Sequence, residues 1–113
     1  MLRSANVRLQ DARQPILSLE SRFDLTYNAA HAAALSALRA HGYRSENRYL
    51  VFQCLEHTLG YTPQQWLLLD QAHKKRNLAE YEGDLDVTQG FVEELVDATA
   101  ALIGAAQALK IST

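Results

Sequence analysis

The chain has 113 residues and a formal net charge of −2 at neutral pH, with hydrophobic residues at 48% and charged residues at 21%. This length predicts a single domain over residues 1–113, and the composition excludes a disordered chain and a membrane-spanning protein. The small negative charge argues against a protein that coats nucleic acid through bulk electrostatics.

Residues 3–14 are rich in arginine and weakly periodic, and they predict at most a short helix that ends at Pro15. A long helix is predicted over about residues 17–40. Five of its residues recur at steps of three and four and therefore share one face: Phe23, Tyr27, Ala30, Ala34 and Leu38.

The ends of this long helix carry recognisable signals. Ser21, followed three residues later by Asp24, resembles a capping pair, although the helix could begin one turn earlier at Ser18. Gly42 is predicted to close the helix as a left-handed cap.

A third helix is predicted to begin near Ser45 and to end before Gly60. The segment 62–65 (TPQQ) then gives the sharpest start signal in the chain, with a threonine cap, a proline at the first helical position and a glutamine at the third. This fourth helix is predicted to continue to about Glu82 and to stop at Gly83.

The last helix follows the acidic turn at residues 84–88 and carries a long apolar stripe of Phe91, Leu95, Ala98, Leu102, Ala106 and Leu109. Alanine and leucine, at 17 and 18 residues, greatly outnumber isoleucine and valine, at 3 and 5. This composition favours helices over strands. We therefore predict an all-α fold, an up-and-down bundle of four to five helices with a core over about residues 18–109.

Arg76 is the most informative residue of the fourth helix. Its apolar stripe contains Leu69, Ala72 and Ala79, and Arg76 lies on the same stripe. A guanidinium cannot lose its charge and is costly to bury unpaired, so this position requires a carboxylate, a phosphate or a water-filled cleft. Either Glu80, one turn away, pairs with Arg76, or the helix lines a groove that binds an anion.

A polar ridge is predicted beside Arg76. His73, Asn77 and Tyr81 are spaced by four residues and lie next to each other on the helix surface. Tyr27, in the middle of the second helix, can pack its ring and still direct its hydroxyl toward the Arg76 region.

Motifs for metal binding or common catalysis are absent from the sequence. The four histidines (His31, His41, His57 and His73) fall on different segments, and Glu56 and His57 are adjacent rather than in the Glu-x-x-His spacing of di-iron bundles. No glycine-rich phosphate loop, Gly-x-Ser-x-Gly elbow or Cys/His pair with helical spacing occurs. We predict neither a metal nor a cofactor.

The chain is expected to reside in a reducing cytoplasm. Its start lacks the apolar stretch of a secretory signal, and its one cysteine, Cys54, cannot form an internal disulfide. No segment is apolar enough to predict a membrane span.

Three stretches together resemble the HEPN superfamily of small helical bundles: SRFDLTYNAAHAAALSALRAHGYR, ENRYLVFQCLEHTLG and AHKKRNLAEYEG. The resemblance covers roughly residues 18–95. It rests on a long helix that contains a tyrosine and ends in a glycine, a second helix, and then an Arg-Asn pair followed by a tyrosine.

The resemblance implies a homodimer in which the arginine-containing helices face each other across a cleft. Many HEPN domains are metal-independent ribonucleases of toxin-antitoxin or defence systems, and many others pair with a minimal nucleotidyltransferase that acts as the antitoxin. The Arg-Asn pair of the family corresponds to Arg76 and Asn77. The histidine that follows it in the family is missing, since position 81 is Tyr81 and no histidine occurs after His73.

This departure leaves three hypotheses. A phenol is a poor base at neutral pH, so the first hypothesis is a module that binds a nucleotide or RNA, or interacts with a nucleotidyltransferase. Its ligand-binding residues are Arg76, Asn77, Glu80, Tyr81 and Tyr27. The second is a metal-independent endoribonuclease that uses Arg76 with His73 or Tyr81. The third is a dimeric scaffold without catalysis.

Overall fold

The computed structural model of the chain describes residues 1–43 and 48–112. The regular structure of these residues is entirely helical, as predicted, and consists of α1 (Leu2–Ala12), α2 (Leu19–Ala40), α3 (Arg48–Gln53), α4 (Leu55–Thr58), α5 (Pro63–Glu82) and α6 (Gln89–Ser112). The predicted onset of the third helix near Ser45 lies outside the described residues.

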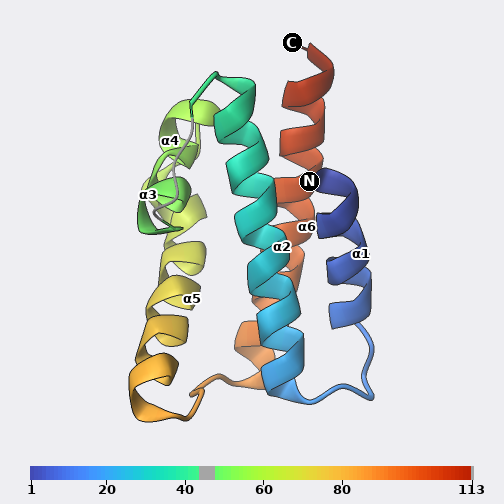
Figure 1. The fold of residues 1–113 in the computed structure, drawn as a ribbon, viewed down its shortest axis with the longest axis vertical. Helices are drawn as coiled ribbons and strands as arrows, with labels where there is room; N and C mark the ends of the chain where they lie inside the picture. The colour runs from blue at the N-terminus through green and yellow to red at the C-terminus, as the bar shows by residue number, and fades with distance from the viewer. Residues whose placement is uncertain (44–47, 113) are drawn as a thin grey trace.

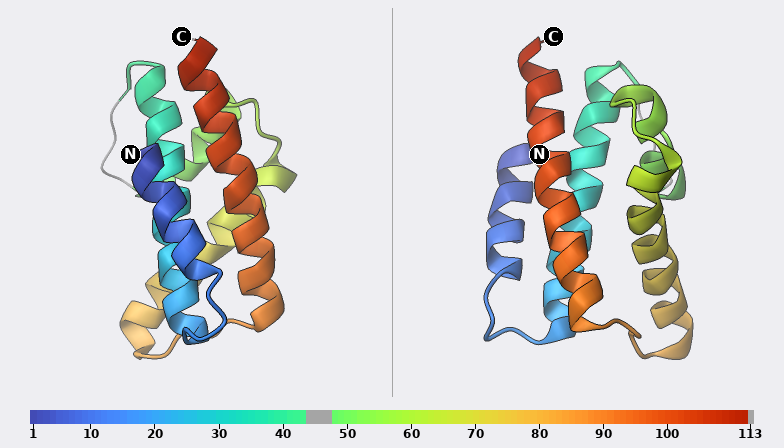
Figure 2. Two further views of the ribbon diagram at one scale, coloured as in Figure 1. Left: turned by 90° about the vertical axis from the view of Figure 1, so that its right-hand side faces the viewer. Right: turned by 180° about the vertical axis from the view of Figure 1, so that it is seen from behind.

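The four long helices alternate in direction along the chain, as Figure 1 shows for α1, α2, α5 and α6. Helix α2 is central. It packs closely against α1 and α6, and its other side contacts the short helices α3 and α4 and the long helix α5 (Figure 2).

The buried surface of α2 is wider than predicted, because other helices pack against it on two sides. The predicted face is buried, from Phe23 at 0% exposure to Leu38 at 4%. A second face, which the sequence reasoning did not identify, is fully buried and consists of Thr26, Ala29, Ala33 and Ala37. Near its start, Arg22 Nε donates to the carbonyl oxygen of Ala12 at 2.8 Å, which joins α2 to the end of α1.

The helix caps follow the local rules, with one correction. Ser18 Oγ accepts a hydrogen bond from the Ser21 amide at 3.1 Å, so Ser18 is the N-cap of α2 and the alternative Ser21–Asp24 pair is wrong. Gly42 follows α2 with a φ of 82°, as predicted for a left-handed cap.

The cap of α5 is confirmed in detail. The Gln65 amide donates to Thr62 Oγ1 at 3.4 Å, and the Thr62 amide donates to Gln65 Oε1 at 2.9 Å, which completes a capping box. Pro63 occupies the first turn and Gly83 ends the helix with a φ of 81°. The direction and length of α5, and thus the place of Arg76, are set by these two ends.

Two features differ from the sequence predictions. The core begins before residue 18, because Leu2, Ala5 and Leu9 of α1 are buried in it. The predicted third helix is two short helices, since the chain turns at Cys54 with a ψ of −13° between α3 and α4. No helix among the described residues is both long and apolar enough to cross a bilayer.

Candidate functional site

Arg76 lies on the inward face of α5, as its spacing predicts. Leu69 and Ala72 on the same stripe are each 1% exposed, while Arg76 is half-buried. Its guanidinium carbon Cζ lies 4.9 Å from the centre of the Tyr27 ring on α2. This is a cation–π contact, in which the ring face attracts the positive charge.

Tyr27 is a fixed platform for this contact. Its side chain is 1% exposed, and its ring centre lies 6.1 Å from that of Phe23 and 5.9 Å from that of Phe52. The His73 ring from α5 stacks on it at 6.4 Å. Because rings from α2, α3 and α5 surround Tyr27, the guanidinium of Arg76 rests on a surface that does not move freely.

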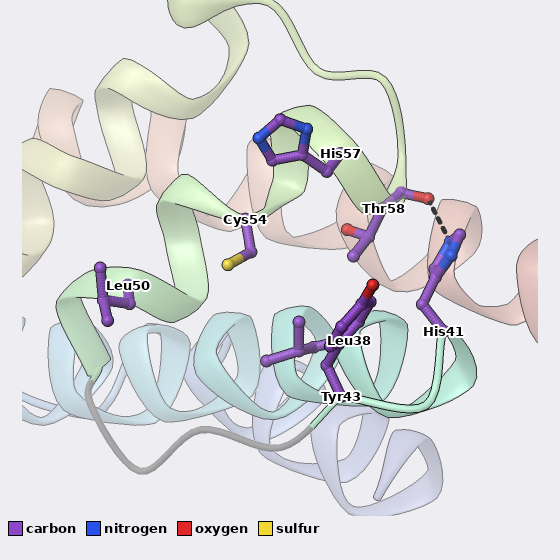
Figure 3. A pocket seen from close by; sticks show the side chains of 7 residues that line it. All are labelled: Leu38, His41, Tyr43, Leu50, Cys54, His57 and Thr58. Carbon is purple, nitrogen blue, oxygen red and sulfur yellow. Dashed lines mark hydrogen bonds between the residues drawn. The ribbon is translucent and has the colours of Figure 1, made fainter.

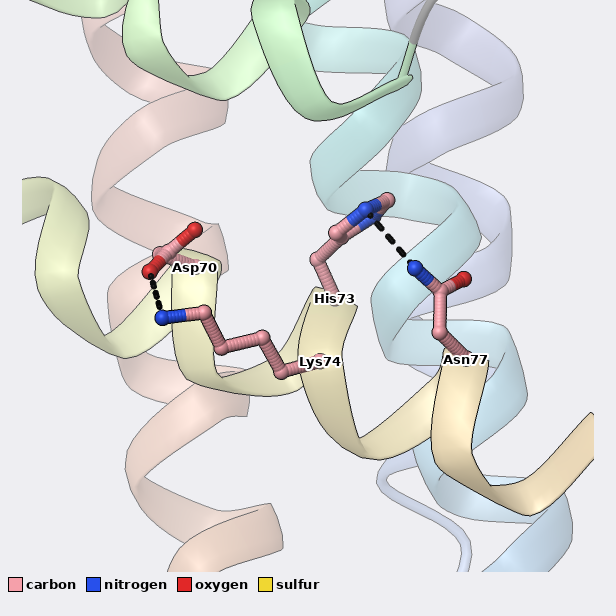
Figure 4. A network of polar contacts seen from close by, with 4 residues as sticks. All are labelled: Asp70, His73, Lys74 and Asn77. Carbon is pink, nitrogen blue, oxygen red and sulfur yellow. Dashed lines mark hydrogen bonds and ion pairs between the residues drawn. The ribbon is translucent and has the colours of Figure 1, made fainter. Parts of the chain in front are cut away.

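A polar relay, buried at Tyr27 and His73 and exposed at Asn77, runs beside Arg76. Tyr27 Oη and His73 Nδ1 are 3.0 Å apart. Asn77 Nδ2 and His73 Nε2 are 3.1 Å apart, as Figure 4 shows for this second pair. If the Asn77 amide donates to Nε2, the imidazole is neutral with its proton on Nδ1, which then donates to Tyr27 Oη. The ridge of His73 and Asn77 and the inward hydroxyl of Tyr27 are therefore brought together as predicted.

The cations next to Arg76 have partners of their own. Lys74 pairs with the buried carboxylate of Asp70 at 3.1 Å, as Figure 4 shows. Lys75 Nζ donates to the carbonyl oxygen of Asp86 at 3.1 Å and lies 5.2 Å from the centre of the Phe91 ring. In the part of the chain that the structure describes, Arg76 makes no ion pair.

Two predicted site residues do not join this group. Glu80 is exposed and forms no ion pair with Arg76, because the guanidinium lies over Tyr27 of the neighbouring helix instead. Tyr81 is 93% exposed, at the solvent-facing end of the ridge, and makes no described contact with His73 or Asn77. The sequence analysis expected the Tyr27 hydroxyl near Arg76 but missed the contact of the guanidinium with the Tyr27 ring, because spacing along one helix does not show which part of a partner on another helix it meets.

The arrangement presents positive charge without a bound counter-charge. Guanidinium N–H groups that no carboxylate occupies can bind an anion in bidentate geometry. His73 is only 8% exposed, and both of its ring nitrogens are engaged within the relay. The relay is thus suited to orienting the site more than to exchanging protons with a substrate.

Comparison of the chain with models of protein families, with curated proteins and with solved structures finds no match. The resemblance to the HEPN superfamily therefore stays a prediction. The described residues hold no group of three or more His, Cys, Asp or Glu side chains that could bind a metal ion.

Proposed function

We propose that the chain binds a phosphate group of a nucleotide or of RNA at Arg76. One observation carries this proposal: the guanidinium is half-buried on the inward face of α5, rests on the ring of Tyr27, and has no carboxylate partner among the described residues. A charge placed in this way is stabilised further when an anion binds it.

Phosphate fits this site better than a lone carboxylate on chemical grounds. The planar fork of an arginine matches two phosphate oxygens, and the contact with Tyr27 limits the orientation of that fork. Asn77, one residue later and exposed, offers an amide close to the same surface. The exposed ring of Tyr81 is available to stack on a base without sequence preference.

A partner protein is part of the proposal. On the side of α5 that faces away from the bundle, Leu67 and Leu78 are 49% and 51% exposed. Leu67 lies nine residues before Arg76, about 180° around the helix, so this stripe and the anion site use opposite faces of α5. The stripe supports a homodimer or a complex with a nucleotidyltransferase, although a dimer through this face differs from the one that the HEPN resemblance implies, in which the arginines face a shared cleft. A dimer formed through the stripe would be lost in Leu78→Glu.

The binding proposal is tested with a labelled single-stranded RNA, ATP and inorganic phosphate as separate probes. Fluorescence anisotropy for RNA and calorimetry for the small ligands should show that Arg76→Ala weakens binding by about tenfold, the effect of one charged hydrogen-bonding group. For RNA, the slope of log affinity against log salt should fall by about 0.7, the value for one lost phosphate contact.

The matched control is Arg8→Ala, which removes the same charge from the exposed surface of α1. It should leave affinity for ATP and phosphate unchanged. If neither RNA, ATP nor phosphate binds the wild-type protein, or if both arginine variants lose affinity equally, the proposal fails.

A ribonuclease is the second candidate, because His73 lies one turn from Arg76 and hydrogen bonds to Asn77. The enclosure of the imidazole and the exposure of Tyr81 weigh against it. If the chain is a ribonuclease, the purified protein cleaves RNA in the presence of a chelator. His73→Ala and Arg76→Ala then each abolish cleavage, whereas only Arg76→Ala loses RNA binding.

A scaffold in which Arg76 only sets the helix arrangement makes a different prediction. Arg76→Leu would then change the oligomeric state measured by light scattering, without any loss of phosphate affinity.

A further inference from the structure

The outward side of α1 carries opposite charges at equal distances from an exposed valine. Arg3, Val7 and Asp11 are spaced by four residues and all exposed, so they form one row along the helix. Ser4 and Gln10, three residues before and after Val7, form a second exposed row that crosses the first at Val7. The opposite side of α1 packs against α2 and α6, so this outward side faces away from the bundle.

This surface is complementary to a second copy of itself. When two copies of α1 pack antiparallel about a two-fold axis beside Val7, each residue before Val7 meets the residue equally far after Val7 in the other copy. Arg3 therefore lies opposite Asp11 of the other copy, and Ser4 lies opposite Gln10. Because of the symmetry, each of these contacts forms twice.

The spacing also fits the commonest way in which two helices pack. Side chains four residues apart form ridges on a helix, and helices whose ridges of this kind interlock cross at about 50°. Arg3, Val7 and Asp11 form such a ridge, so the ridges of the two copies lie side by side and run in opposite directions. The two valines then pack together at the centre, between the two ion pairs.

The charges of this row are not used within one chain. Arg3 and Asp11 are separated by about 12 Å along the helix axis, too far to pair with each other. In residues 1–43 and 48–112, neither of them forms an ion pair with any other residue. Val7 is 54% exposed, which leaves its apolar side chain in contact with water until a second copy covers it.

The outward side of α1 suits a helix better than a small molecule. The cavity in Figure 3 lies between the end of α2 and the α3–α4 corner, and no residue of α1 belongs to its described lining. Figure 1 shows α1 and α5 on opposite sides of the bundle, so a contact through α1 does not involve the Arg76 site. The exposed stripe of α5 then stays available to a different protein.

We propose that two copies of the chain dimerise through α1, antiparallel about Val7, with reciprocal ion pairs between Arg3 and Asp11. A contact between two single helices is small for a protein interface, so the expected dissociation constant is about 100 μM. This dimer does not depend on the binding of phosphate at Arg76.

The test exchanges the two charges of the row. Analytical ultracentrifugation of the full chain at several concentrations measures the dissociation constant. Arg3→Asp and Asp11→Arg should each raise it at least about tenfold, because each change places like charges opposite each other twice. Both changes suit the helix dipole, with an acid in the first turn and a base in the last, so α1 should still form, as circular dichroism checks.

The two variants are then mixed in equal amounts. One carries only acids at the charged positions of the row and the other carries only arginines, so the mixture should associate about as tightly as the wild type. A variant that carries both changes should also dimerise with itself.

The matched control is Arg8→Asp, the same charge change at an exposed position of α1 outside the row. It should leave the dissociation constant unchanged. Arg76→Ala and Leu78→Glu should also keep the dimer, since both residues lie on α5.

Four results would each overturn the proposal. The first is a wild-type chain that stays monomeric at about 1 mM, ten times the expected dissociation constant. The second is equal weakening by Arg3→Asp and Arg8→Asp, which would show an effect of net charge alone. The third is a mixture of the two charge variants that does not associate. The fourth is a dimer lost in Leu78→Glu but kept in Arg3→Asp, which would place the interface on α5.

Discussion

The two buried faces of α2 are built from different side chains. The small buried residues of α2 are Thr26, Ala29, Ala33 and Ala37, and α2 packs most closely against α1 and α6. Toward α3 and α5, it presents Tyr27, whose ring meets Phe52 edge-on and stacks with His73, while Phe23 beside it stacks with Tyr27 and with Phe91 at the start of α6. One helix thus forms a tight seam of small residues on one side and an aromatic layer on the other.

This difference explains where the candidate site can exist. A seam of alanines leaves no room for a guanidinium or an imidazole between two helices. On the α5 side, the Tyr27 ring lies between the helices, and it contacts the guanidinium of Arg76 and stacks with the ring of His73. The alanine seam therefore provides stability, and the aromatic layer provides a place for charged groups.

The largest effect is expected from overfilling the seam. Ala33→Leu puts a much larger side chain at a position that is 0% exposed, between helices that are already in close contact. We expect the free energy of unfolding to fall by about 3 kcal/mol, at the upper end for overpacked cores. Urea denaturation, followed by circular dichroism, measures this loss.

The matched control for the seam is Ala101→Leu, the same change at an exposed position of α6. It should leave stability unchanged within about 0.5 kcal/mol. If Ala33→Leu is equally harmless, then α2 and α6 are not as tightly packed as the alanine seam implies, and the contrast between the two faces disappears.

A smaller effect is expected on the aromatic side. Tyr27→Phe keeps the ring under Arg76 but removes the hydroxyl that contacts His73 Nδ1 at 3.0 Å. The buried imidazole then loses a partner, and the free energy of unfolding should fall by about 1–2 kcal/mol. Tyr43→Phe, at a side chain that is 65% exposed, is the control and should have no effect.

The same variant separates the relay from the cation–π contact. Phosphate affinity at Arg76 should change little in Tyr27→Phe and fall in Tyr27→Leu, because only the second change removes the aromatic face. Equal phosphate affinity in both variants would show that the ring of Tyr27 does not orient the guanidinium.

Local sequence rules predicted most of the fold. Thr62, Pro63 and Gly83 set the ends of α5 through interactions within a few residues, so their effect could be read from the sequence. The break at Cys54 could not, because neither proline nor glycine marks it. The burial of α1 could have been predicted from the helical spacing of its buried residues, which are Leu2, Ala5, Leu9 and Ala12. The arginines between them made this apolar pattern hard to recognise.

The candidate site was predicted in most of what depends on one helix, and between helices only in the expectation that the Tyr27 hydroxyl points toward the Arg76 region. The inward place of Arg76 and the pairing of His73 with Asn77 follow from α5 alone. The choice between Glu80 and an interhelical partner required knowing which face of α2 lies opposite. Arg76 contacts Tyr27 because the Tyr27 ring is held in place on the facing helix. Glu80 lies near the end of α5, is exposed and does not pair with Arg76.

The smallest effect is a pH dependence at the start of α5. Burial raises the pKa of the Tyr61 phenol above its usual value of 10.0. Above about pH 10 the unfolded chain releases this proton before the folded protein does, so the free energy of unfolding falls as the pH rises. Tyr61→Phe should therefore lose less stability than the wild type between about pH 8 and pH 11, as measured by urea denaturation at both values. The control is Tyr81→Phe, at a side chain that is 93% exposed, which should lose as much stability over this pH range as the wild type. If Tyr61→Phe loses as much stability as the wild type, the Tyr61 phenol is as well hydrated in the folded protein as in the unfolded chain.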